Sequence, residues 1–216
     1  MLSDTIRQKL PDLALMCIQC RVQVRDADTA LLEKINTAIT QLSSTLTIDT
    51  IKFRPAIEAT REAYLALGKK PSRYRPSAEA LSRRALQGKG LYQVNNVVDL
   101  LNLVSIQTGF SIGGYDADKI KGTATLGIGE ENEPYEAIGR GELNIHNLPL
   151  FRDEQGAFGS PTSDSARTMV RPETTNFLMV IFGFAGKEGL ESAKDFAIDL
   201  LKNHAAGTDF SVELFS

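Results

Sequence analysis

One stretch, residues 94–116, constrains the fold more than any other part of the chain. It opens with Asn95 and Asn96, and either can cap a helix by accepting a hydrogen bond from an unpaired amide of the first turn. Apolar residues then fill nearly every position for three turns, so we expect a helix that is packed on most of its circumference. Gly109 ends this helix, and residues 110–115 follow as a short strand that contains a Gly-Gly pair.

Two polar residues, Asp99 and Asn102, lie three positions apart in this apolar helix and therefore share one of its faces. A buried polar group needs a hydrogen-bonding partner, so both require an explanation. We expect Asp99 to anchor the helix structurally. For Asn102 the sequence leaves two alternatives open, a functional group or a tie to a neighbouring strand.

A Cys-x-x-Cys pair, Cys17 and Cys20, lies in a run with the alternating pattern of a half-buried strand, residues 14–25. Residues three apart on a strand face opposite ways, which disfavours a disulfide or a shared metal between them. We expect Cys20 in the core and Cys17 on the other face. His146 and His204 have no second ligand nearby in the sequence, so neither a metal site nor a cofactor is expected.

The composition is that of an ordinary globular protein, with 42% apolar residues, 24% charged residues and a net charge of −3. The 216 residues fit one compact unit, in which 1–52 supply a leading strand and helix and 53–216 the remainder. No apolar run of about 18 residues occurs, and the first residues lack the apolar core of a signal peptide. We therefore expect a cytoplasmic protein without membrane contact.

The remaining elements follow from hydrophobic spacing and from capping or turn residues. Helices are expected over 28–44, 55–67, 77–86 and 189–204. Short strands are expected over 123–128, 136–138, 142–146 and 157–159. An interior strand covered on both faces is expected over 177–184, and an edge strand over 210–215.

Positive charge is concentrated in residues 69–89, where seven basic residues face Glu79 alone. Tyr74 and Tyr92 lie in or beside this segment, and basic groups interleaved with aromatic ones suit phosphates and stacked bases. The alternative is a solvated helix face with capping arginines. The candidate RNA-binding residues are Lys69, Lys70, Arg73, Arg75, Arg83, Arg84 and Lys89.

Four segments together resemble a known domain: PAIEATREAYLALG, KPSRYRPSAEALSRRAL, the stretch 94–116 and DSARTMVRPETTNFLMVIFG. In this order they are similar to the B3/B4 domain, the tRNA-binding and editing domain of the bacterial phenylalanyl-tRNA synthetase beta subunit, in its free-standing form. The resemblance covers roughly residues 53–186. It implies an α+β fold, a single domain with helices packed on mixed β-sheets, which the element order permits.

In the synthetase this domain hydrolyses the ester between tyrosine and the tRNA that should carry phenylalanine. Such a site mainly has to position a water molecule and stabilise the oxyanion, because an aminoacyl ester is already activated. By analogy Asn102 orients the substrate or water, and Asp164 is the one acid near the position of the synthetase's pocket glutamate. The resemblance implies a pocket formed by Gly113, Gly114, Tyr115, Asp116, Ser165, Thr168 and Thr174.

The sequence departs from the synthetase at Gly113, which takes the position of a histidine, so tyrosine specificity is not carried over. Asp116 is also typical of a turn aspartate that accepts from loop amides, and residues 164–165 and 174–176 also suit turns or strand starts.

Two functions remain open. One is a tRNA-binding module that clears misacylated tRNA in trans, and the other is a non-catalytic pocket for an amino acid or similar small molecule. Complete aminoacyl-tRNA ligation is not expected, because the chain contains no ATP-binding aminoacylation module.

Overall fold

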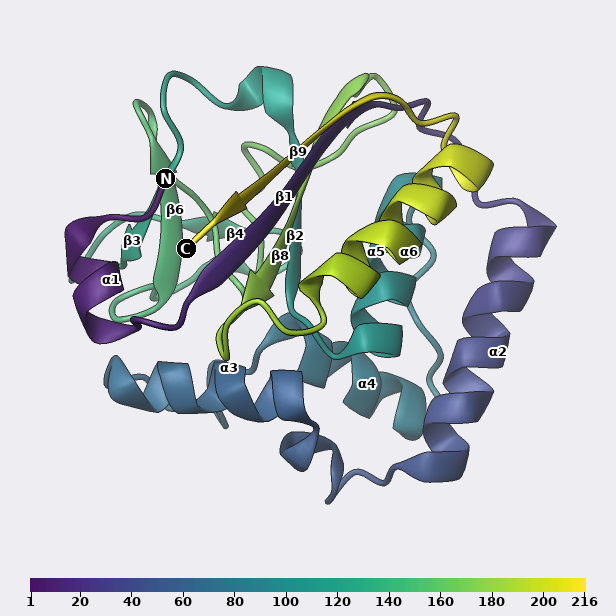
Figure 1. Ribbon diagram of the computed structural model, residues 1–216, viewed down its shortest axis with the longest axis horizontal. Helices are drawn as coiled ribbons and strands as arrows, with labels where there is room; N and C mark the ends of the chain where they lie inside the picture. The colour runs from purple at the N-terminus through teal and green to yellow at the C-terminus, as the bar shows by residue number, and fades with distance from the viewer.

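A four-stranded antiparallel sheet forms the centre of the molecule in the computed structural model, which describes all 216 residues (Figure 1). The strand order is β2 (Ile112–Asp116), β8 (Asn176–Gly183), β1 (Ala14–Arg21) and β9 (Thr208–Phe215). The interior strand β8 and the edge strand β9 confirm the expectations from sequence. Because β1 pairs with both β8 and β9, the first residues of the chain belong to this sheet.

The two faces of β8 are both apolar because each is covered by a different layer. Phe177, Met179 and Ile181 lie in the core on the helical side. Val180 and Phe182 lie in a second core, shared with a smaller sheet. This explains why residues 177–184 form a continuous apolar run instead of an alternating one.

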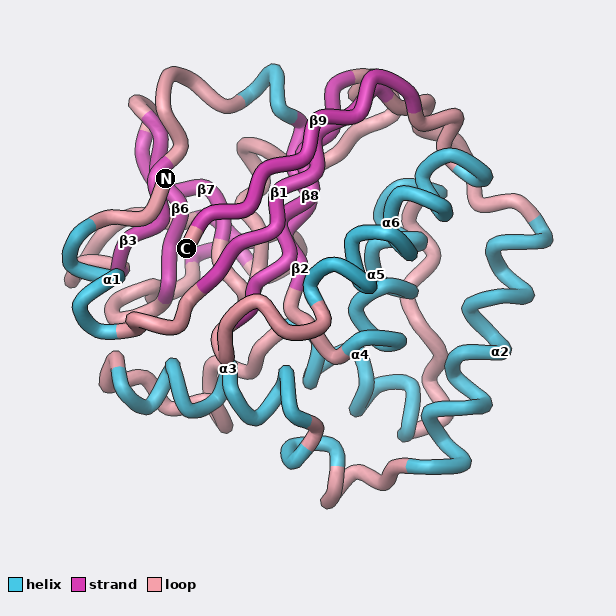
Figure 2. Tube along the Cα trace, viewed as in Figure 1, coloured by secondary structure: helices cyan, strands magenta, loops and turns pink.

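Most helices gather on one side of the sheet, whereas the smaller strands and the short N-terminal helix, Asp4–Lys9, lie on the other (Figure 2). The central helix α5 (Asn96–Thr108) is buried at every residue from Asn96 to Ile106 except Val98. Asn95 caps it through Val98 N, and Gly109 ends it with a φ of 85°. The helices are α1 (Asp4–Lys9), α2 (Thr29–Thr45), α3 (Pro55–Ala66), α4 (Ser77–Leu86), α5 (Asn96–Thr108) and α6 (Leu190–His204), with short 3-10 turns η1 (Ile51–Phe53) and η2 (Ala117–Lys119).

The smaller layer consists of a three-stranded sheet and a hairpin. The sheet has the order β3 (Thr125–Ile128), β6 (Pro149–Asp153) and β7 (Gly156–Gly159), and the hairpin joins β4 (Glu136–Ala137) to β5 (Gly141–Glu142). All strand pairs in the molecule are antiparallel, and one isolated parallel bridge joins Leu2 to Leu126. The α+β class is confirmed.

Three details differ from the sequence predictions. The prediction of a strand over 142–146 is wrong beyond Glu142, where β5 ends. The carbonyl oxygens of Asn144 and His146 accept hydrogen bonds from the Lys69 ammonium and not from a neighbouring strand. Helix α1 and strand β6 were not predicted; α1 is six residues long, and β6 begins at a proline.

The two cysteines face opposite sides of β1, as expected. Cys20 lies in the core on the helical side, and Cys17 packs against the core on the other side. Both thiols are free.

Candidate functional site

A cavity of about 630 Å³ brings together several of the residues singled out from the sequence. We call it the cleft. Its walls come from helix α4 and the segment that follows it, helix α5, strand β2, the β4–β5 hairpin and residues 162–170. Asn102, Gly114 and Asp164 line it, together with four of the predicted RNA-binding residues, Arg75, Arg83, Arg84 and Lys89.

Asn102 differs from Asn96, the other asparagine of helix α5, because its side chain has no hydrogen-bond partner. Asn96 fastens the helix by donating to the Gln23 and His204 carbonyl oxygens and accepting from Arg25 N. The Asn102 side chain lines the cleft at 9% exposure and forms no hydrogen bond within the chain. The structure thus contains no tie from Asn102 to a neighbouring strand, which was one of the two alternatives, and the amide is free to bind a group in the cleft.

Asp164 lies at the free edge of strand β2. Its Oδ2 accepts a hydrogen bond from Gly114 N at 3.1 Å, while Oδ1 is buried without a hydrogen-bond partner. Burial raises the pKa of this carboxyl to about 7. A carboxyl that changes charge near neutral pH in a cleft is a candidate acid, base or ligand-binding group.

Glu79, buried at 1% exposure, holds the arginines of the cleft in place. Its carboxylate is 2.8 Å from both Arg61 Nη1 and Arg83 Nε, and 3.6 Å from Arg75 Nε. Arg84 lies against Tyr92, with its guanidinium carbon 3.8 Å from the ring centroid. The lining carries five basic residues, counting Arg140, and one acid, in a chain whose net charge is −3.

The three other predicted RNA-binding residues lie outside the cleft lining. Lys70 and Arg73 are exposed on the surface. Lys69 is buried, with its ammonium 3.0 Å from the Asn144 carbonyl oxygen and 3.7 Å from the Tyr74 ring centroid. Burial lowers the pKa of Lys69 to about 8. This lysine is occupied in fastening a loop and presents little charge to an outside partner.

Most of the predicted pocket residues lie elsewhere, in packed structure around the far end of β2. Asp116 accepts from Thr174 Oγ1 at 2.9 Å and from Asp118 N at 3.1 Å. Thr168 accepts from Asp116 N through its carbonyl oxygen, and Ser165 caps a turn at Arg167 N. Each of these side chains has a hydrogen-bond partner within the chain, and none of them lines the cleft.

Gly113 and Tyr115 face away from the cleft, because successive strand residues point to opposite faces. Tyr115 is fully buried with Phe151 and Phe158 on the side of the smaller sheet. A Cβ at Gly113 would lie 2.1 Å from the Tyr115 hydroxyl oxygen. The tyrosine therefore occupies the space that a side chain at Gly113 would need, and of the Gly-Gly pair only Gly114 borders the cleft.

Sequence reasoning missed the contribution of the β4–β5 hairpin, whose Ile138 and Arg140 line the cleft. The available signal was an arginine between two glycines after an exposed isoleucine, Ile-Gly-Arg-Gly, typical of a hairpin tip. Nothing in that signal indicates what the tip faces.

No group of three or more His, Cys, Asp and Glu side chains is arranged to hold a metal ion. His204, for example, places Nδ1 3.1 Å from Asp28 Oδ1, a pairing of two residues. No helix combines the length and the apolar character needed to cross a membrane.

The fold and the cleft define an α+β domain with a basic pocket, and comparison identifies its family. A family model described as the B3/4 domain matches residues 59–204, and the chain belongs to that family. No curated protein matches the sequence. Among solved structures, the chain is similar to an N-terminal fragment of the phenylalanyl-tRNA synthetase beta-subunit from Pyrococcus horikoshii, with 16% identity and a TM-score of 0.49. That match covers 96% of this chain and 48% of the other.

Proposed function

We propose that the protein binds the acceptor end of tRNA and hydrolyses a misplaced aminoacyl ester in its cleft, acting in trans. The observation that supports this most is the combination of a free Asn102 amide and the Asp164 carboxyl with five basic residues in one cavity. The B3/4 family and the resemblance in sequence to an editing domain point to the same substrate class. A cytoplasmic location, where charged tRNA is used, is part of the proposal.

The basic residues supply the binding of RNA. Five basic residues line the cleft and attract phosphates although the whole chain is acidic: Arg75, Arg83, Arg84, Lys89 and Arg140. Glu79 keeps Arg83 and Arg75 oriented, which lowers the entropy lost when they bind a phosphate. Binding of this kind weakens steeply as salt is added.

The two polar groups supply the chemistry. A water molecule attacks the acyl carbon, its oxygen forms the new C–O bond, the ester C–O bond breaks, and the ribose hydroxyl leaves with a proton. Asp164, ionised above its pKa of about 7, accepts a proton from the attacking water and passes it to the ribose oxygen as the ester bond breaks. The Asn102 amide N–H donates to the carbonyl oxygen as it becomes negative.

A second candidate function is a non-catalytic pocket for an amino acid. The observation that favours it is the apolar wall formed by Leu101, Ile112 and Phe177 beside the Asp164 carboxyl. Such a surface suits an apolar side chain and an ammonium group, with or without an attached RNA.

A deacylation panel distinguishes the two functions. Several misacylated tRNAs, including ones carrying D-amino acids, are incubated with the wild type, with Asn102→Ala and with Gln107→Ala. Gln107 is the matched control because it is exposed on the same helix. We expect hydrolysis of at least one substrate, a loss of about 100-fold in kcat for Asn102→Ala, and no change for Gln107→Ala. Hydrolysis of no substrate, with thermal stabilisation by a free amino acid, would establish the second function instead.

A further inference from the structure

Exposed apolar side chains gather where the cleft opens. Tyr92, Val94 and Ile138 are 58%, 57% and 42% exposed, and all three line the cleft. Exposed apolar side chains that cluster beside a polar cavity are typical of a binding surface. They lie among the basic residues Arg84, Lys89 and Arg140.

Tyr92 is held in a defined position. The guanidinium of Arg84 lies 3.8 Å from the ring centroid, within the range of a cation–π contact. Arg84 Nε is itself buried without a hydrogen-bond partner. With one side of the ring occupied by Arg84 and more than half of the residue exposed, a flat apolar surface remains open to a partner.

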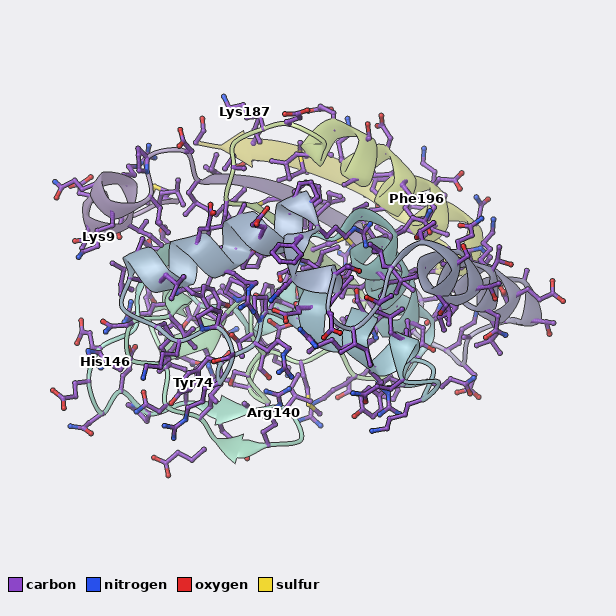
Figure 3. All side chains as sticks on the ribbon, turned by 90° about the horizontal axis from the view of Figure 1, so that it is seen from below. Lys9, Tyr74, Arg140, His146, Lys187 and Phe196 are labelled. Carbon is purple, nitrogen blue, oxygen red and sulfur yellow. The ribbon has the colours of Figure 1, made fainter.

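The β4–β5 hairpin contributes the other apolar and cationic groups. Ile138 N donates to the Asp164 carbonyl oxygen at 3.0 Å, which fixes the hairpin tip beside the polar residues of the cleft. Gly139 and Gly141 flank Arg140 with φ angles of 67° and 69°, conformations that suit glycine. Figure 3 shows Arg140 at the end of this hairpin, at the edge of the molecule.

We propose that Tyr92, with Arg84 against its ring and Ile138 nearby, forms a stacking site for one unpaired nucleobase at the end of an RNA strand. A nucleobase offers a flat face to an aromatic ring, and the phosphate that accompanies it is attracted by Lys89 and Arg140. Charge complementarity selects this occupant, because the lining carries five basic residues and one acid. The inference rests on the RNA binding of the proposed function and is independent of ester hydrolysis.

The test uses an uncharged RNA hairpin with a single-stranded 3′ overhang whose last base is 2-aminopurine, a fluorescent base that is quenched by stacking. We expect quenching on binding to the wild type. Tyr92→Ala should lose the quenching and bind about tenfold more weakly, whereas Tyr92→Phe, which keeps the ring, should retain both. Phe53→Ala is the matched control, since Phe53 is an aromatic residue of 59% exposure outside the cleft.

The outcomes separate this inference from the proposed function. Salt-sensitive binding of the RNA with unchanged fluorescence, and equal binding by Tyr92→Ala, would overturn the stacking site and leave RNA binding intact. Quenching that depends on Tyr92, without hydrolysis of any aminoacyl ester, would support the stacking site and remove the hydrolase. Absence of RNA binding at low salt would overturn both.

Discussion

Two aspartates at strand β2, one in the strand and one beside it, have different surroundings. Near its C-terminal end, Asp116 is 3% exposed, and each of its carboxylate oxygens accepts a hydrogen bond, from Thr174 Oγ1 and from Asp118 N. Beside its middle, Asp164 accepts one hydrogen bond, from Gly114 N, and keeps a buried oxygen without a partner.

This difference indicates that Asp116 has a structural role and Asp164 a functional one. Buried polar groups in proteins are nearly always paired, so the pairing of Asp116 is what stability alone requires. The buried Asp164 Oδ1 without a hydrogen bond has a cost in stability that packing does not explain, and the Asn102 amide faces the same cavity. We therefore infer that the part of β2 that borders the cleft, at Gly114 beside Asn102 and Asp164, is the functional part.

The largest effect on stability is expected at Asp116. Asp116→Ala leaves the Thr174 hydroxyl and Asp118 N without their acceptor, and should lower the free energy of unfolding by about 3 kcal/mol. Asp164→Asn keeps an acceptor for Gly114 N and should cost less than about 1 kcal/mol. Urea unfolding of both variants measures the contrast. Equal losses would mean that both carboxyl groups are structural.

A large effect on RNA binding is expected from the charges at the cleft opening. Lys89→Glu combined with Arg140→Glu should weaken tRNA binding at least tenfold at low salt and reduce the slope of log K against log salt by about 2. Neither residue forms an ion pair within the chain, so the fold should be unaffected. Lys9→Glu, on helix α1 away from Arg140 (Figure 3), is the control. An equal effect of the control would indicate diffuse, non-specific attraction.

A third expected effect is the pH dependence of stability. The pKa of Asp164 is raised to about 7 by burial, so the folded state binds the proton more tightly than the unfolded state, whose carboxyl titrates near 4. The stabilisation from protonation is complete below pH 4 and is lost as pH rises to 7. Relative to Asp164→Asn, the wild type should lose stability across this window in thermal melts at stepped pH. Parallel profiles would show that the pKa is ordinary.

The sequence predicts the framework because each element carries its own pattern. Helix α5 has its asparagine cap and glycine stop, and β8 is apolar on both faces. The site is less predictable, since the Gly114–Asp164 contact joins residues fifty positions apart and β2 is buried at every residue. No alternation in β2 shows which face borders the cleft. The sequence therefore predicts four pocket residues that the structure places in packed regions outside the cleft: Asp116, Ser165, Thr168 and Thr174.

The contrast between the two aspartates can be measured directly with carboxyl ¹³C NMR of the wild type. The ligand is an adenosine whose 3′ position carries an amino acid through an amide, which the protein cannot hydrolyse as an ester. We predict that saturating ligand shifts the Asp164 carboxyl signal, leaves the Asp116 signal unchanged, and has a weaker effect in Asn102→Ala. A shift at Asp116 without one at Asp164, or no shift at either, would contradict the assignment of the cleft as the functional site.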